Sequence, residues 1–212
     1  MSKSTMTTQT KSADTNAIAA LKKDHTMVKQ LFDQFEESES SSEKEEIIEK
    51  AIQELKLHAT VEEEIFYPAL RGSVEDEDMM NEAEQEHHVA RLLIAELELN
   101  AKDEGRRNAK FTVLAESVRH HIKEEEGQIF PAAKELDIDF DELGRQMNER
   151  KQELMDEGVP PDAEHEMVSG AGGGRTSRTK ERTTVAMGKA NRKSSSRESS
   201  KESSKDSKAR KT

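Results

Sequence analysis

Two stretches of the sequence repeat the same combination of imidazole and carboxylate side chains. They read HATVEEEIFYPA, from His58 to Ala69, and HIKEEEGQIFPA, from His121 to Ala132. Each begins with a histidine, has a glutamate four residues later, and has a proline ten residues after the histidine. On a helix, side chains four residues apart lie one above the other on the same face. Each stretch can therefore direct one imidazole and one carboxylate at the same point, as a metal site requires.

A second repeated motif supplies two further histidines. DHTMVKQLF, which contains His25, matches EHHVARLLI, which contains His87, in an acid, a histidine and a basic residue four positions after the histidine. All four histidines share a helical face with apolar residues, so we expect them to point into the core. The repeats thus predict a buried metal site with six ligands: His25, His58, Glu62, His87, His121 and Glu125.

The composition of this ligand set bears on which metal it suits. Buried histidines are costly unless their nitrogens are satisfied, and a single core histidine usually finds a hydrogen-bond partner instead of a metal. The duplication favours metal binding here. Imidazole and carboxylate without thiolate suit iron, manganese or zinc, and the sequence contains no cysteine. Six ligands are enough for two ions.

The adjacent His88 and His120 lie off the apolar stripes and are predicted to be surface or supporting residues. Tyr67 is predicted to pack at a helix end.

The elements that must position these residues are helical. Apolar residues recur at helical spacing between about Asn16 and Met155. The pattern predicts long helices over residues 14–38, 42–70, 75–101 and 108–134, with Ser42 and Glu45 as a capping box for the second, and a shorter fifth helix that ends near Asp156. Because the connections are short and strand signals are absent, we expect an all-α, up-down-up-down four-helix bundle with a short extra C-terminal helix.

Composition sets the limits of the folded domain. Charged residues make up 37% of the chain and apolar residues 32%, so only part of the chain can form a core. We predict a disordered N-terminus over residues 1–13, a metal-binding domain over residues 14–156, and a disordered Gly/Ser/Lys-rich tail over residues 157–212. From Ser169 onwards, basic residues outnumber acidic ones thirteen to four, although the whole chain has a formal net charge of -12. This predicts an acidic body with a basic tail.

The order and spacing of these motifs resemble the hemerythrin-like HHE cation-binding domain of bacterial type. The resemblance covers about Asn16 to Met155 and rests on Asp24-His25, His58 to Glu62, Glu86-His87 and His121 to Glu125. It implies a non-haem di-iron centre with oxo or hydroxo bridging, in which the histidines are terminal ligands and Glu62 and Glu125 bridge the irons; other divalent metals also fit the ligand set. Oxygen-carrying members have a fifth histidine where this chain has Ala83, which favours small-ligand chemistry over reversible oxygen carriage.

Three functions are consistent with the sequence. The first is a di-iron protein that binds or senses O2, peroxide or nitric oxide in oxidative or nitrosative stress. The second is a peroxide-decomposing, catalase-like enzyme, and the third is a helical scaffold whose basic tail binds DNA or another polyanion weakly. The absence of an apolar run long enough to span a membrane, and of a secretory signal, predicts a cytoplasmic protein without a membrane partner. The sequence does not predict an oligomeric state.

Overall fold

The computed structural model describes residues 16–73, 77–99 and 103–172. Within these ranges the chain is helical and has no strand. The helices are α1 (Ala17–Glu37), α2 (Ser41–Val61), α3 (Tyr67–Leu70), α4 (Glu77–Leu99), α5 (Glu104–Glu124), α6 (Phe130–Lys134), α7 (Phe140–Glu157) and α8 (Ala163–Gly172). The predicted N-terminal segment 1–13 and most of the basic tail lie outside the described residues.

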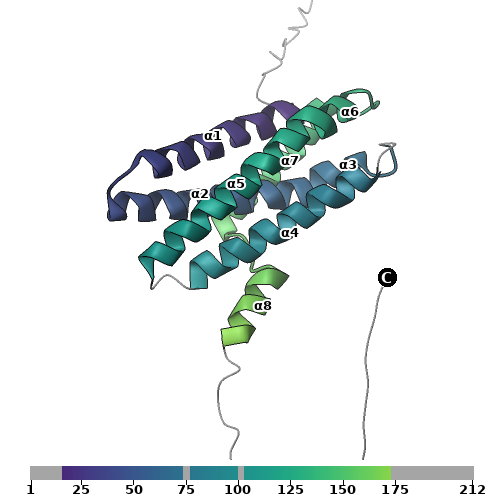
Figure 1. The fold of residues 1–212 in the computed structure, drawn as a ribbon. Coiled ribbons are helices and arrows are strands. Elements are labelled where there is room, and N and C mark those ends of the chain that lie inside the picture. The colour runs from purple at the N-terminus through teal and green to yellow at the C-terminus, as the bar shows by residue number, and fades with distance from the viewer. Residues whose placement is uncertain (1–15, 74–76, 100–102, 173–212) are drawn as a thin grey trace, which may run out of the picture. The chain divides into compact units, whose positions relative to one another are not determined.

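The helices are arranged as the predicted bundle. In Figure 1 the long helices lie side by side, and α1 packs on α2 and α5 while α4 packs on α5 and α2. Helix α7 packs against α1 and α2, and α8 packs against α4. This arrangement confirms the all-α, hemerythrin-like bundle with an extra C-terminal helix. None of the described helices is long and apolar enough to cross a membrane.

Side-chain caps fix where the helices begin. The Asn16 side chain accepts a hydrogen bond from the backbone N–H of Ala19, and the Asp103 side chain accepts one from Arg106. The second helix begins earlier than predicted, because Ser40 is its N-cap and accepts from the N–H of Glu43. Ser42 and Glu45 therefore do not form the capping box. The serine cluster repeats the same Ser-x-x-Glu spacing two residues apart, so the pattern alone did not decide between them.

Both repeated stretches, from His58 to Ala69 and from His121 to Ala132, contain a wide helical turn that their sequence does not predict. The chain forms π-helical turns at Glu62–Phe66 and at Glu125–Ile129, where the N–H of Tyr67 donates to the carbonyl of Glu62 and that of Phe130 to the carbonyl of Glu125. Each turn directly precedes a helix with proline in its first turn. Proline lacks an N–H and clashes with the carbonyl four residues earlier in a regular helix, and a wider turn relieves this conflict. Such turns are frequent at functional sites.

The core is divided into two apolar clusters by the layer that holds the histidines. One cluster includes Leu21, Val61 and Ala83, and the other includes Val28, Leu55 and Val118. The four long helices that carry the histidines, with the π turn that continues α5, thus pass from one cluster to the other, and their histidines lie near the crossing point. Apolar packing on both sides fixes the helices, which in turn fixes where the polar side chains meet.

The C-terminal region differs from the prediction. Disorder was expected from residue 157 onwards, but α8 is a helix over Ala163–Gly172, after residues 158–162, which form no regular secondary structure. Gly158 has a positive φ of 87° and ends α7, a conformation that favours glycine. The physical reason for the added helix is tertiary contact: Glu164 is buried and paired with side chains of α4. Residues 173–212 lie outside the described part of the chain.

Candidate metal centre

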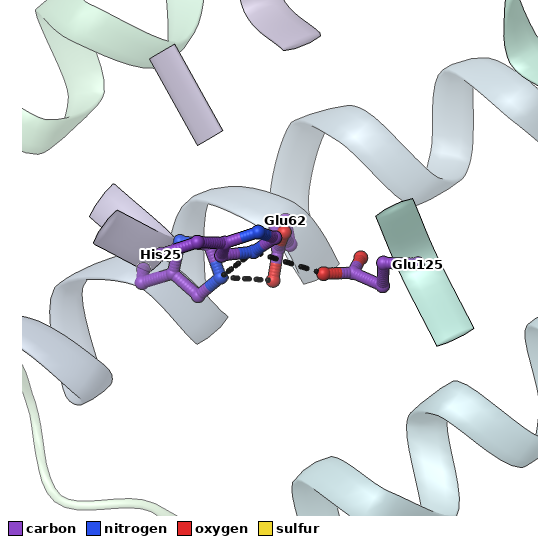
Figure 2. Close-up of side chains that lie close together, drawn as sticks. His25, Glu62 and Glu125 are labelled. Carbon is purple, nitrogen blue, oxygen red and sulfur yellow. Dashed lines mark hydrogen bonds and ion pairs between the residues drawn. The ribbon is translucent and has the colours of Figure 1, made fainter. Parts of the chain in front are cut away.

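Six polar side chains converge in the layer between the two apolar clusters. Figure 2 shows His25, Glu62 and Glu125 pointing toward one another from α1 and from the π turns that follow α2 and α5. Both glutamates are fully buried. The histidines are at most 5% exposed. The structure thus brings together all six residues predicted from the repeats: His25, His58, Glu62, His87, His121 and Glu125.

The first half of the centre is formed around the imidazoles of His25 and His58. Their Nε2 atoms lie 3.2 Å apart. Nε2 of His25 lies 3.1 Å from Oε2 of Glu125, and Nε2 of His58 lies 3.1 Å from Oε2 of Glu62. Two imidazole nitrogens and two carboxylate oxygens therefore face one small volume.

The second half repeats this arrangement with His87 and His121. Their Nε2 atoms lie 3.0 Å apart. Nε2 of His87 lies 3.5 Å from Oε2 of Glu62, and Nε2 of His121 lies 3.3 Å from Oε2 of Glu125. Each carboxylate therefore contacts one histidine from each half, and each lies between the two groups of ligand atoms.

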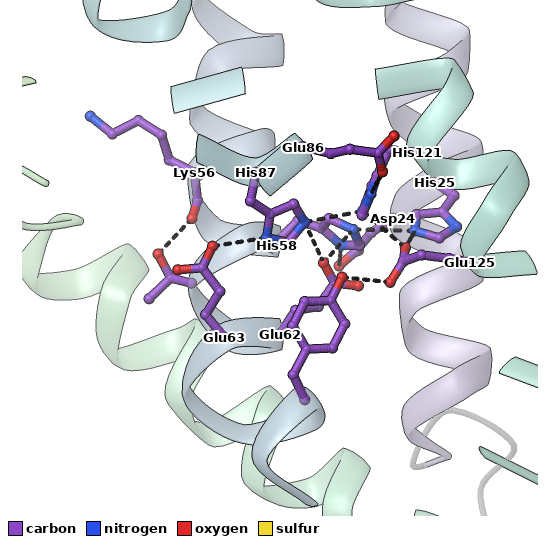
Figure 3. Close-up of polar contacts among 12 residues, drawn as sticks. Asp24, His25, Lys56, His58, Glu62, Glu63, Glu86, His87, His121 and Glu125 are labelled. Atoms are coloured by element: carbon purple, nitrogen blue, oxygen red, sulfur yellow. Dashed lines mark hydrogen bonds and ion pairs between the residues drawn. The ribbon is translucent and has the colours of Figure 1, made fainter. Parts of the chain in front are cut away.

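Each histidine has a carboxylate near its outer nitrogen, and these outer carboxylates follow the same internal repeat. Figure 3 shows Asp24, Glu63 and Glu86 around the histidine layer. The acids that precede His25 and His87 face the other two histidines: Asp24 lies 3.7 Å from Nδ1 of His58, and Glu86 lies 2.9 Å from Nδ1 of His121. The acids that follow the buried glutamates face the other two histidines. Glu63 Oε1 lies 2.8 Å from Nδ1 of His87, and Glu126 Oε1 lies 3.0 Å from Nδ1 of His25.

A carboxylate beside Nδ1 influences which imidazole nitrogen carries the proton. A carboxylate acceptor favours the tautomer with the proton on Nδ1, which leaves the Nε2 lone pair free to face the centre. Metal-binding histidines in proteins typically have such a partner. The 3.7 Å separation of Asp24 and His58 is too long for a hydrogen bond, so His58 is the least firmly oriented of the set.

A further layer of basic residues contacts the outer carboxylates. Lys151 of α7 pairs with Asp24 at 2.8 Å, and Lys29 pairs with Glu126 at 3.4 Å. Arg91 pairs with Glu63, while His120 lies 3.6 Å from Glu86. Lys151, Arg91 and Lys29 are positively charged and help to hold Asp24, Glu63 and Glu126 in position. Lys29 and Arg91 occupy the same place in the two repeats, four residues after a histidine, which was visible in the sequence without its role being recognised.

Burial and neighbouring charges shift the pKa values in the centre. Burial raises the pKa of Glu62 well above its usual range, and the nearby Glu125 raises it further. Burial also opposes ionisation of Glu125, but the imidazoles of His121 and His25 beside its carboxylate hold its pKa well below the usual range. Burial lowers the pKa of His58 to about 4. Burial acts in the same direction on His121, but Glu125 and Glu86 raise its pKa to about 9.

Several buried polar atoms of the centre have unmet bonding capacity. Within the described residues, both carboxylate oxygens of Glu62, Oε2 of Glu125 and Nδ1 of His58 lack a hydrogen bond. Unpartnered buried polar atoms are rare in folded proteins because they are costly. A metal ion accepts electron pairs from carboxylate oxygens, and so an ion in the centre satisfies the unpartnered oxygens of Glu62 and Glu125. The residues present therefore fit a metal cofactor.

Tyr67 makes the two halves chemically unequal. The sequence favoured a packing role for this residue, but its hydroxyl donates a hydrogen bond to Oε1 of Glu125 at 2.8 Å, and its ring lies over His87. The corresponding residue of the second repeat is Phe130, which stacks on His25 and has no hydroxyl. Glu125 is therefore held by a phenol, whereas Glu62 has no such donor.

Removing the Tyr67 hydroxyl tests how strongly it holds Glu125. Tyr67→Phe leaves a buried carboxylate oxygen without its donor, so we expect the free energy of unfolding of the metal-free protein to fall by about 1.5–3 kcal/mol. Denaturant titration measures this change. Metal should still be present in the loaded variant, because Tyr67→Phe leaves all six predicted ligands in place. A loss below about 0.5 kcal/mol would show that the hydrogen bond does not hold Glu125 in solution.

The raised pKa values of His121 and Glu62 predict how the metal-free protein responds to pH. A group whose pKa is higher in the folded chain stabilises the fold when protonated, and this stabilisation is lost as the pH rises through the folded value. For His121 the window runs from 6.5 to about 9, and the shift of Glu62 acts in the same direction. We expect the melting temperature of the metal-free protein to fall across this window.

Calorimetry on metal-free and metal-loaded samples at matched pH checks this expectation. Metal binding requires deprotonated ligands, so the loaded protein has no such protons to lose and its melting temperature should change little over the same range. A metal-free protein that becomes more stable with rising pH would contradict the assignment of these protons.

Comparison with known proteins identifies a family. The hemerythrin HHE cation-binding domain model matches residues 16–133, which include every one of the six buried residues and end before α7. No curated protein and no solved structure matches the chain. The fold, the buried histidine and glutamate layer and this match agree that the domain binds metal.

Proposed function

Because the chain belongs to the hemerythrin HHE cation-binding domain family, we propose that it is a non-haem di-iron protein that binds or senses O2, peroxide or nitric oxide. In this proposal the terminal ligands are four histidines and the bridging ligands are two glutamates: His25, His58, His87, His121, Glu62 and Glu125. Its cellular role would lie in the response to oxidative or nitrosative stress.

One observation carries the proposal of two metal ions. Ligand atoms form two groups, one around His25 and His58 and one around His87 and His121, and Glu62 belongs to both. Glu125 completes the symmetry, since it contacts His25 in the first group and His121 in the second. A single ion would not need two carboxylates that each contact both groups. The ligand set also partly neutralises the charge of two divalent ions in a buried layer.

Iron bound in this set would supply one-electron redox chemistry and coordination of small molecules. The protein's own residues orient the imidazoles and exclude water. The outer carboxylates keep the imidazole Nε2 atoms directed inward, and the apolar clusters on both sides limit the access of water. Ala83 stands where oxygen carriers of the family have a further histidine. Without this further histidine, the centre has fewer protein ligands than in an oxygen carrier. This favours reaction with small molecules over reversible oxygen carriage.

Rapid mixing of the ferrous protein with each small ligand tests this proposal. Samples are mixed with O2, hydrogen peroxide or nitric oxide, and absorption is followed while an oxygen electrode records any gas released. Spectral change that depends on the ligand and is absent from a His87→Ala variant supports ligand binding at the centre. Sustained O2 release from peroxide would favour the catalase-like enzyme instead. A ferrous protein that responds to none of the three ligands would exclude both functions.

A further inference from the structure

A cavity next to the histidine layer is much larger than O2, peroxide or nitric oxide requires. Its volume is about 400 Å³, and all four histidines contribute to its lining. Pockets for small organic molecules typically have volumes of about 300–1,000 Å³, whereas a single water occupies about 30 Å³ of liquid volume. The cavity therefore has room for an organic molecule directly beside the metal centre.

The inner wall of the cavity is apolar and comes from every long helix of the bundle. It is formed by side chains that are buried in the second apolar cluster: Val28, Leu55, Ile94, Val118 and Ile122. Ala90 of α4 also lines the cavity, and its small side chain leaves space there. An apolar wall of this kind favours a ligand with an apolar body.

The outer wall is supplied by the segment between α7 and α8. Val159 to Glu164 line the cavity, and this segment lies beyond residue 133, where the family match ends. Glu164 fixes the segment, because its carboxylate lies 2.5 Å from Nδ1 of His88 and 3.3 Å from Nε of Arg91 on α4. The enclosure is thus a feature of this chain's own C-terminal extension.

Charged side chains around the cavity are already paired with protein groups. Lys56 pairs with Glu98, and Arg91 pairs with Glu63 and Glu164. The remaining acids of the lining also have partners: Glu64 contacts Arg150, Glu86 contacts His121, and Asp162 accepts from the N–H of His165. A charged ligand would have to break such a pair or enter an apolar space unpaired, and both are costly.

From these observations we propose that the cavity binds a small neutral organic molecule with an apolar body, held next to the metal centre by the bundle and the 159–164 segment. This proposal goes beyond the binding of O2, peroxide or nitric oxide, because the apolar wall would hold the organic molecule while the histidine layer borders the same cavity. Molecules of this class that carry a reactive group would present it to the histidine layer.

Three probes with the same aromatic body test the proposal by titration calorimetry on the purified, metal-loaded protein. Benzyl alcohol is neutral, benzoate is an anion and benzylammonium is a cation. We expect benzyl alcohol to bind in the cavity at least about tenfold more tightly than either charged probe, because the charged side chains that line it are already paired with groups of the described chain. Absence of benzyl alcohol binding, or tighter binding of an ion, would overturn the proposal.

A pair of adjacent substitutions locates the binding. Ala90→Phe fills the cavity and should weaken benzyl alcohol binding by at least about tenfold, whereas Val89→Phe changes a residue that is 47% exposed and should leave binding unchanged. Metal content shows whether each variant is folded, and Ala90→Leu replaces Ala90→Phe if the larger side chain prevents loading. Equal binding by wild type and filled variant would place the probe elsewhere and overturn the proposal. Since metal content is measured independently, this failure would not bear on the di-iron centre.

Discussion

His121→Ala is expected to abolish metal binding at the centre. The imidazole supplies one of the inward-facing Nε2 atoms, and its removal also takes one imidazole contact from Glu125 and the closest partner from Glu86. Changes in the outer partners of metal-binding histidines already cost about 10–100-fold in affinity, so loss of a ligand should exceed about 100-fold. Competition with a chromophoric chelator measures the change in metal affinity.

The neighbouring histidine provides a matched control. His120 is on the same helix, and its side chain is 60% exposed, so His120→Ala removes the same chemical group outside the centre. This variant should retain its metal with little change in affinity. Loss of metal in both variants, or in neither, would show that the centre is not built as described.

Glu63→Ala is expected to weaken metal binding although Glu63 is not one of the six converging residues. Its carboxylate holds Nδ1 of His87 and contacts Arg91. Without it, the imidazole of His87 can rotate or change tautomer, and its Nε2 becomes a poorer donor. We expect the affinity to fall by about 10–100-fold, measured by the same competition assay.

Two further variants separate this orienting role from a general effect of charge. Glu64→Ala removes the adjacent carboxylate, which pairs with Arg150 of α7, and should change the affinity little. Glu63→Gln keeps a hydrogen-bond acceptor for His87 and should recover part of the lost affinity. If Glu64→Ala were as damaging as Glu63→Ala, the loss would reflect local charge instead of the orientation of His87.

The buried layer was predictable because its signal is repeated. His58 and Glu62 recur as His121 and Glu125 with the same spacing, and helical phase places all of them on core-facing stripes. The helix order and the bundle follow from the same periodicity together with the short connections. Periodicity also separated His121 from the exposed His120, which differ by only one position in the sequence.

Features that depend on contacts between distant segments were not predictable. Glu63 lies in a run of glutamates that reads as a solvated face, and only the packed bundle shows that it reaches His87 on another helix. Tyr67 was interpreted as a packing residue, since nothing local indicates that its hydroxyl meets Glu125.

The helix in the C-terminal extension was not predictable for the same reason. The segment around Glu164 is weakly periodic and rich in polar residues, so disorder was the natural expectation. Its helix is stabilised by an ion-pair cluster with His88 and Arg91, which are far away in the sequence. Pro160 and Pro161 come shortly before this helix, and the cavity wall to which they contribute exists only in the folded chain.

Elemental analysis of the purified protein tests the central claim most directly. Protein from iron-supplied cells is freed of loosely bound metal, and metal per chain is measured together with the absorption spectrum. The proposed centre predicts two irons per chain and the near-ultraviolet bands of an oxo-bridged pair, both absent from His58→Ala and His121→Ala. A wild-type protein that contains no stoichiometric metal, and whose stability is unchanged by both substitutions, would mean that the repeated histidines and glutamates serve packing alone.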